Sequence, residues 1–294
     1  MYLRSRLDFL IGAQNPDGGW GYFPGKRSWL EPTVYAMLAL NGDPRAQSAL
    51  ERGWKALRSW QLPGGAWRGG PQVLGAHWAT ALAVTLHVVR RQLDGPFEAG
   101  VEWLLGVMGS EENLWLWMAR WLRVQTIEFD PSLHGWPWTV GASSWVEPTA
   151  HTLICLRKAA PYCRNRKLAM RVEMAEKFLL DRRCTDWGWN YGNRRVLKVD
   201  LPSFEESTAM ALLALRGNPR IDVRDSLRRA RKFWDEKPSP VGRAWLAIAL
   251  RNYGVALEDP SGSRPSQGDV LLAALEALGC AQGGYRLLSP EARL

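Results

Sequence analysis

The sequence predicts an all-α protein of helical hairpins, and three observations lead to that prediction. Roughly twelve segments carry apolar residues at helical spacing, and no segment has the alternation of a convincing strand. Helices with one polar face alternate with helices that are apolar on every side, which indicates an outer layer and a buried inner layer. A loop rich in Trp and Gly, followed by an apolar helix, also recurs along the chain. Because an open superhelix would leave its apolar concave face in water, we expect about six hairpins to close into a ring.

Each hairpin consists of an outer helix, a loop and an inner helix. They are expected at residues 3–13 with 31–40, 54–60 with 77–88, 97–107 and 111–125 with 147–159, 166–181 with 206–215, and 223–234 with 241–253. A sixth unit starts with an outer helix at 269–279, but the sequence stops before a matching inner helix. We therefore expect residues 1–294 to form one domain whose last inner helix is missing, supplied by a partner or replaced by other packing.

The composition indicates a globular protein with an ample core, because 46% of the residues are hydrophobic. The net charge is +9, and the basic residues are interpreted as solvated helix faces, although an acidic membrane surface could also attract them. No nucleic-acid-binding module is present. Four widely spaced cysteines without a CxxC motif, and no leader or bilayer-spanning apolar run, indicate a reduced cytoplasmic protein; peripheral contact with a membrane stays open as an alternative.

Three inner helices begin with a glutamate, namely Glu31, Glu147 and Glu206. The simpler interpretation is that each acid caps its helix and meets the positive end of the helix dipole. The alternative is that the three acids and His77 converge on one mouth of the ring. Desolvation and like charge would then raise their proton affinity and make a carboxylic acid a proton donor.

Residues four apart on a helix share a face, which pairs Glu147 with His151 and Glu31 with Tyr35. The first pair could act as an acid–base dyad that protonates an alkene or epoxide, or removes a terminating proton; as a packed side-chain pair it needs no function. A zinc site that adds Cys155 has suitable ligand types. We expect no metal there, because three positions on one straight stripe are too far apart for a tetrahedron.

Aromatic and basic residues supply further candidates. The tryptophans that could wall a cavity and stabilise carbocations, or simply pack loops and core, are Trp115, Trp117, Trp121, Trp136, Trp138 and Trp145. Arg194 and Arg195, near Lys198, could bind a diphosphate or form an exposed basic loop.

The loops resemble the QW repeat of the terpenoid cyclase and protein prenyltransferase superfamily. Gln14 with Trp20 and Gln61 with Trp67 match the repeat, and later loops match it in degenerate form. The resemblance implies an (α/α) toroid whose inner helices surround a cavity that holds an isoprenoid chain in relatives. The repeat Gln and Trp are expected to be structural, with Gln bonding unpaired groups at helix ends.

The resemblance extends less far to catalysis. Class II cyclases resembling this chain carry an Asp-x-Asp-Asp motif whose middle acid protonates the substrate; here the nearest stretch contains Glu205 and Glu206. The zinc ligands of prenyltransferase β subunits have no full counterpart, although His151-Thr152 resembles their His-Thr segment. The sequence therefore favours a squalene- or diterpene-cyclase-like enzyme, with Glu206, Glu147, His151 and Glu205 as catalytic candidates.

The remaining site candidates are assigned to substrate binding. They are Glu31, Tyr35, His77, Trp117, Trp138, Trp145, Arg194 and Arg195. No cofactor is expected, and zinc or magnesium is the less favoured alternative. The expected ligand is an isoprenoid or another apolar small molecule. The alternatives are a non-catalytic toroid that binds a lipid or a protein, and a zinc-dependent prenyltransferase β-subunit-like protein that needs a partner. A protein partner or a second copy could also complete the ring.

Overall fold

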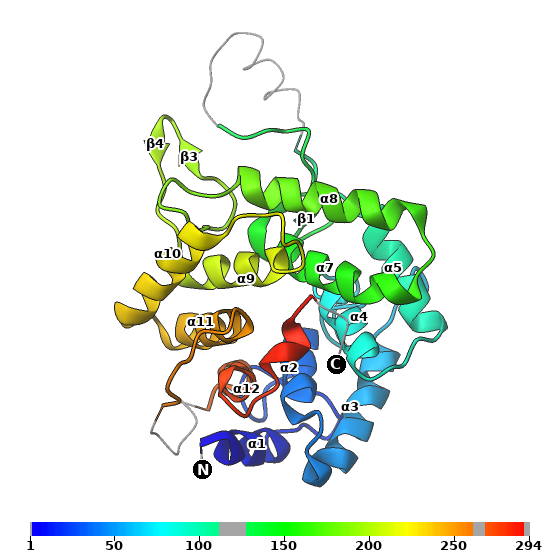
Figure 1. The fold of residues 1–294 in the computed structure, drawn as a ribbon. Helices are drawn as coiled ribbons and strands as arrows, with labels where there is room; N and C mark the ends of the chain where they lie inside the picture. Colours follow the sequence, from blue (N-terminus) through cyan, green and yellow to red (C-terminus); the bar gives the residue numbers. More distant parts are fainter. Residues whose placement is uncertain (1, 112–127, 261–267, 291–294) are drawn as a thin grey trace.

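A computed structural model describes residues 2–111, 128–260 and 268–290, and it confirms the all-α prediction (Figure 1). Strand pairing within the described residues is confined to loops. It forms two antiparallel pairs of two-residue strands, β1 (Trp136–Pro137) with β2 (Ser144–Trp145) and β3 (Arg195–Val196) with β4 (Val199–Asp200). The expected helix at 111–125 lies almost wholly outside the described residues.

Apolar helices form a closed inner ring. They are α2 (Leu30–Leu40), α4 (Thr80–Val89), α7 (Val146–Ala159), α9 (Glu205–Leu215), α11 (Pro240–Asn252) and α12 (Val270–Gly279). Each packs against the next in this order, and α12 packs against α2, which closes the ring. Figure 1 shows the same succession, from blue α2 to red-orange α12. These helices bury almost all of their side chains, as expected of a layer covered on both sides.

Helices that keep one face exposed cover this ring from outside. They are α1 (Tyr2–Gly12), α3 (Gln47–Ser59), α5 (Gly95–Gly106), α8 (Arg166–Asp181) and α10 (Arg224–Asp235), with short 3₁₀ turns η1 (Pro44–Ala46), η2 (Ala160–Tyr162) and η3 (Tyr285–Leu288). The prediction that residues 269–279 form an outer helix was wrong. The helix found there, α12, lies between α11 and α2 and has α1 on its outside, because it is apolar on nearly every side and must be buried.

The recurring Trp ties each loop to both helices of its hairpin. The Trp20 indole N–H donates to the carbonyl of Leu10 in the outer helix at 2.7 Å, and its backbone N–H donates to Thr33 Oγ1 in the inner helix at 2.9 Å. The same pair of bonds occurs at Trp67, Trp136 and Trp189, with Thr80, Thr149 and Thr208 as the inner-helix partners. Each tryptophan is buried, so the bonds satisfy polar groups that water cannot reach.

The glutamines have the structural role expected of them. Gln14 donates to the carbonyls of Gly18 and Ala49, and Gln61 donates to those of Gly65 and Pro96. Each side chain therefore joins its own loop to the first turn of the next outer helix.

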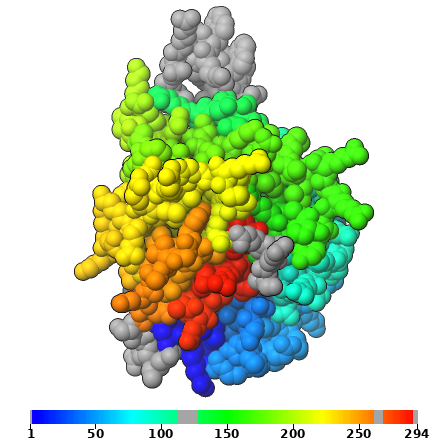
Figure 2. Space-filling view, viewed as in Figure 1, coloured from blue at the N-terminus to red at the C-terminus, as the bar shows by residue number. Residues whose placement is uncertain are grey.

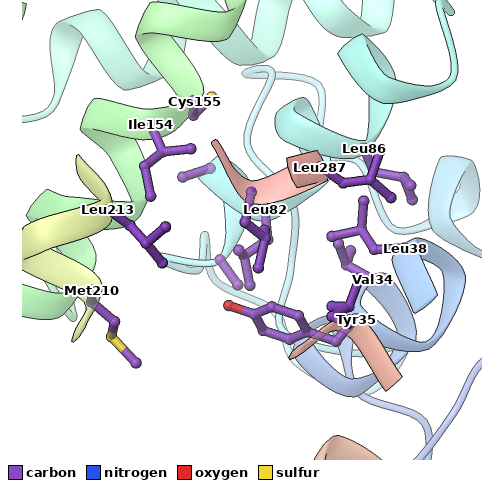
Figure 3. Packing of buried hydrophobic residues seen from close by; sticks show 14 of the residues in the cluster. Val34, Tyr35, Leu38, Leu82, Leu86, Ile154, Cys155, Met210, Leu213 and Leu287 are labelled. Atoms are coloured by element: carbon purple, nitrogen blue, oxygen red, sulfur yellow. The ribbon is translucent and has the colours of Figure 1, made fainter. Parts of the chain in front are cut away.

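One end of the ring is filled from inside. The 3₁₀ turn η3 lies at the carboxyl ends of the inner helices, where Asn252 at the end of α11 donates to the carbonyl of Tyr285 at 3.0 Å. Leu287 projects from this turn towards Leu82, Leu86 and residues of α2 (Figure 3). In Figure 2 the red C-terminal segment occupies the middle of the visible face. The opposite end, where the inner helices begin, is called the mouth below.

Candidate functional site

The three glutamates do not cap their helices, and that interpretation was wrong. The N-cap positions of α2, α7 and α9 are occupied by Trp29, Trp145 and Phe204, each with extended backbone, and none of these caps has a side-chain cap hydrogen bond. Glu31, Glu147 and Glu206 are each the second residue of their helix. Their carboxyl groups still lie in the first turn, near the positive end of the dipole, but they make no capping bond.

The Trp-to-Thr hydrogen bonds align four inner helices turn by turn. The residues that stand two positions before each bonded Thr are Glu31 on α2, Trp78 in the turn that opens α4, Glu147 on α7 and Glu206 on α9. Two residues after it stand Tyr35, Leu82, His151 and Met210. The first set forms the rim of the mouth, and the second set lies one helical turn deeper.

Glu147 is the rim acid of α7, and the charges of both other rim glutamates act on it. Its side chain is 20% exposed. Burial raises its pKa to about 8, and the nearby charges of Glu31 and Glu206 contribute to the same shift. At pH 7 the carboxyl group of Glu147 is therefore mostly protonated, which is the state that a proton donor needs.

Glu31 has a different partner. The Tyr22 hydroxyl donates to Glu31 Oε2 at 2.5 Å, a bond that stabilises the ionised carboxylate. Burial outweighs this bond and raises the Glu31 pKa, with a further contribution from Asp269. Glu31, Glu147 and Asp269, at the amino-terminal ends of α2, α7 and α12, therefore lie close enough for the charge of one to act on another.

Glu205 and Glu206 both contact the start of α11. The backbone N–H of Ser239 donates to Glu205 Oε1 at 3.2 Å, and the Ser239 hydroxyl donates to Glu206 Oε1 at 3.4 Å. Burial and the neighbouring Glu205 charge raise the Glu206 pKa, while the Ser239 bond opposes the shift. Glu206 is therefore an acid of raised pKa at the mouth, and Glu205 anchors the loop before α11.

His151 lies beneath Glu147, with Nε2 at 4.0 Å from Glu147 Oε1. The imidazole is 3% exposed, and burial lowers its pKa to about 3, so the ring is neutral at pH 7. Its Nε2 also lies 3.4 Å from the Tyr35 hydroxyl. The rings of Trp78 and Trp245 approach it with centroids at 5.4 and 5.7 Å.

Three of these aromatic side chains meet across the centre of the helical toroid. Tyr35, His151 and Trp245 come from α2, α7 and α11, which are not neighbours in the inner layer, and the Tyr35–Trp245 centroids are 5.8 Å apart. The centre of the toroid is therefore occupied by aromatic side chains at this depth, and further apolar residues fill it below (Figure 3). The rim of the mouth is therefore acidic, and its floor, one helical turn deeper, is aromatic.

The predicted aromatic lining is brought together only in part. Trp138 packs edge-on against Trp78 at 4.7 Å between centroids, beside the floor. Trp145, at the N-cap of α7, is 37% exposed and lies outside that cluster. Trp117, with Trp115 and Trp121, lies outside the described residues.

Three other predicted residues lie apart from the acids. His77 directly precedes Trp78, and it is Trp78 that takes the position that Glu147 has in α7. The Nδ1 atom of His77 accepts a hydrogen bond from the Ala79 N–H at 3.3 Å. Arg195 pairs with Glu128 and Asp200 at 3.2 Å each. Arg194 and Arg195 line a surface pocket of about 440 Å³ beside the C-terminal end of α8. These arginines are therefore not part of the mouth.

Sequence reasoning missed Tyr22, Trp78, Trp245 and Asp269. Tyr22 stands two residues after Trp20, as Trp138 stands two after Trp136, so aligning the loops on their bonded Trp would have identified it. Trp245 has no such signal, because its loop lacks the repeat. Within the described part of the chain, no three His, Cys, Asp or Glu side chains are grouped as a metal would require.

Comparison with known proteins identifies the fold. No protein-family model matches the chain. Drimenyl diphosphate synthase of Streptantibioticus cattleyicolor is 39% identical over 72 residues, which are 24% of this chain and 14% of that synthase. The match thus spans a small part of both proteins.

Solved structures match almost the whole chain. The type II terpene cyclase MstE from Scytonema superposes with a TM-score of 0.55 at 17% identity, covering 94% of this chain and 77% of the cyclase. An MstE variant in complex with its substrate, geranylgeranyl dihydroxybenzoate, matches at 18% identity with a TM-score of 0.55, covering 94% and 75%. Endoglucanase Cel10 of Klebsiella pneumoniae, a family 8 glycosyl hydrolase, gives a TM-score of 0.61 at 12% identity, covering 94% and 97%. The chain therefore has the helical toroid fold of type II terpene cyclases, a fold that also serves a glycosyl hydrolase.

Proposed function

We propose that this protein is an isoprenoid-handling enzyme that begins cyclisation by protonating its substrate, with Glu147 as the proton donor. One observation carries the proposal: the largely buried carboxyl group of Glu147, whose pKa desolvation raises to about 8, lies above a floor of aromatic rings. A carboxyl group that is protonated near neutral pH can start such a reaction by donating its proton, with neither a metal ion nor the departure of a diphosphate. The fold, shared with type II terpene cyclases, supports the same class of chemistry.

The first step transfers the Glu147 proton to a carbon of an alkene, whose π electrons form the new C–H bond. Glu147 becomes a carboxylate, and the substrate becomes a tertiary carbocation. A second alkene then supplies its electron pair to close a ring. The faces of Trp78, Trp245 and Tyr35 stabilise the positive charge through their quadrupoles. Nearby Glu31, held by Tyr22, adds negative charge when it is ionised.

His151 is suited to the last step. Its Nε2 is an unprotonated acceptor before the reaction, because burial keeps the imidazole neutral. Once Glu147 has lost its proton, its negative charge 4.0 Å away favours a protonated imidazole. His151 can then take a proton from the final cation, which forms an alkene, and return it to Glu147.

A second candidate is a non-catalytic toroid that binds an apolar ligand or a protein. The specific observation in its favour is that Tyr35, His151 and Trp245 meet across the ring, so that a bound chain would need these side chains to move. The zinc-dependent prenyltransferase is not supported, because the described residues contain no group of ligands for the metal.

The test is product analysis after incubation with squalene, farnesyl diphosphate, geranylgeranyl diphosphate and geranylgeraniol, with a glucan oligosaccharide as the control for glycosyl hydrolysis. We expect a cyclic product from one of the isoprenoids. Glu147→Gln should lower kcat by at least about a hundredfold, because the amide cannot donate the proton. Glu206→Gln should lower kcat less, because Glu206 acts through the field at Glu147.

The matched control is Glu173→Gln, which changes an exposed glutamate on α8. Conversion of no isoprenoid by the wild type, or full activity in Glu147→Gln, would refute the assignment. Binding of an isoprenoid without conversion would instead support the non-catalytic candidate.

A further inference from the structure

The exposed apolar side chains are distributed unevenly over the molecule. Apart from Leu93, Tyr162 and Met170, every large exposed apolar side chain in the described part of the chain lies in a loop that leads from an outer helix into an inner helix. These loops surround the mouth. We call the segments 20–29, 67–79, 136–145 and 187–204 the collar. Its apolar side chains include Phe23 (47% exposed), Leu74 (88%) and Val140 (60%).

The collar is continuous along its arc. Each of its loops, or the helix residue that directly follows it, is attached to the next loop by a hydrogen bond or an aromatic contact, so that the exposed side chains are carried on loops that are held together. The attachments are Leu30 N to Gly69 O at 2.8 Å, Trp78 to Trp138 at 4.7 Å between centroids, and Val146 N to Tyr191 O at 2.9 Å. A concentration of exposed apolar side chains in one set of joined loops indicates an interaction site, whereas side chains scattered singly over a surface do not.

Basic residues stand among these apolar residues. Lys26 and Arg27 are exposed in the same loop as Phe23. Lys198 is exposed at the tip of the β3–β4 turn beside Leu197, and both residues have positive φ (65° and 50°), as in a tight turn. Apolar side chains interspersed with lysine and arginine are the combination that binds an anionic lipid surface. The insertion of a few apolar side chains gives weak binding by itself, and so does the attraction of a few basic residues to the lipids.

We propose that the collar binds the surface of a bilayer that contains anionic lipids, with Phe23, Leu74 and Val140 inserted below the headgroups. Lys26, Arg27 and Lys198 then lie at the level of the phosphates. No described helix is long and apolar enough to cross a membrane, so the attachment is by loops. It turns the mouth towards the bilayer, where apolar molecules are dissolved. The proposal concerns binding alone and does not depend on whether Glu147 is catalytic.

The experiment is co-sedimentation of the full chain with two kinds of vesicle, pure phosphatidylcholine and an equal mixture of phosphatidylcholine and phosphatidylglycerol. We expect binding to the mixed vesicles. The triple variant Phe23→Ser, Leu74→Ser, Val140→Ser should partition roughly tenfold less or weaker still, because it removes three apolar side chains from the contact. The double variant Lys26→Glu, Arg27→Glu should lose roughly tenfold on the mixed vesicles only.

The matched control is Tyr162→Ser, Met170→Ser, which replaces apolar side chains of similar exposure outside the collar. It should bind as the wild type does. Circular dichroism checks that each variant is folded, and light scattering reports the oligomeric state. The proposal is overturned if the wild type binds neither vesicle, if the triple variant binds like the wild type, or if the control loses as much. It is also overturned if the triple variant dissociates a wild-type dimer, because the collar would then be an interface between copies.

Discussion

Replacing Glu147 by glutamine should make the protein more stable, and more so at higher pH. The Glu147 pKa is raised from its ordinary value of 4.5 to about 8. A group whose folded pKa is raised keeps its proton in the folded state while the unfolded chain loses it, so stability falls as the pH rises from about 4.5 to about 8. Each pKa unit corresponds to about 1.4 kcal/mol, which gives an upper limit of about 5 kcal/mol. Solvent reaches a fifth of the side chain, and we therefore expect about 2–3 kcal/mol.

Glutamine has nearly the shape of protonated glutamate and carries no charge, so Glu147→Gln removes this pH dependence. Against the wild type, the variant should gain about 2–3 kcal/mol at pH 8 and almost nothing at pH 4.5. Urea unfolding at a series of pH values measures the difference directly. The control is Glu173→Gln on the exposed surface of α8, which should show no such gain. A gain for Glu147→Gln that is the same at both pH values would show that Glu147 is ionised in the folded protein, and the proposed donor would be lost.

Three further predictions follow from the same contacts. Isoprenoid conversion should fall as the pH rises through about 8, because Glu147 then loses the proton that it donates; a pH–rate profile that rises through this range would contradict this role. In Tyr22→Phe, Glu31 loses the bond that favours its ionised form, so more of it is protonated; the weaker charge should lower the Glu147 pKa and move the profile to lower pH, and an unchanged profile would exclude this coupling. Thr33→Val leaves the buried N–H of Trp20 without an acceptor and should cost about 1–3 kcal/mol in urea unfolding, whereas a neutral result would mean that the repeated bond adds little.

Local patterns were sufficient for the helices and for their division into layers. A helix that is apolar on every side, such as α2, must be buried, and a helix such as α10 with one polar face must have that face in water. The repeated Trp loops also located the starts of α2, α7 and α9. The same rule applied to α12 would have placed it in the inner layer, but the alternation of outer and inner helices along the chain suggested otherwise. Only the packing of α12 between α11 and α2 decided the point.

Sequence alone could not distinguish a capping glutamate from one in the first turn. That difference is two residues, and it is set by the pairing of β1 with β2, which makes Trp145 the N-cap and places Glu147 inside α7. The pattern Glu-Pro-Thr is compatible with either position. Capping depends on the backbone angles of one residue, and in this loop a tertiary contact determines them.

The sequence by itself determined which residues are acidic, aromatic and buried, because composition and periodicity are local properties. The tertiary structure decided which carboxyl group keeps its proton and what lies beneath it. The Glu147 pKa depends on the proximity of Glu31 and Glu206, and the floor depends on Tyr35, His151 and Trp245 meeting across the ring. Desolvation and repulsion between like charges depend on distances through space, and residues on separate helices acquire those distances only when the ring closes.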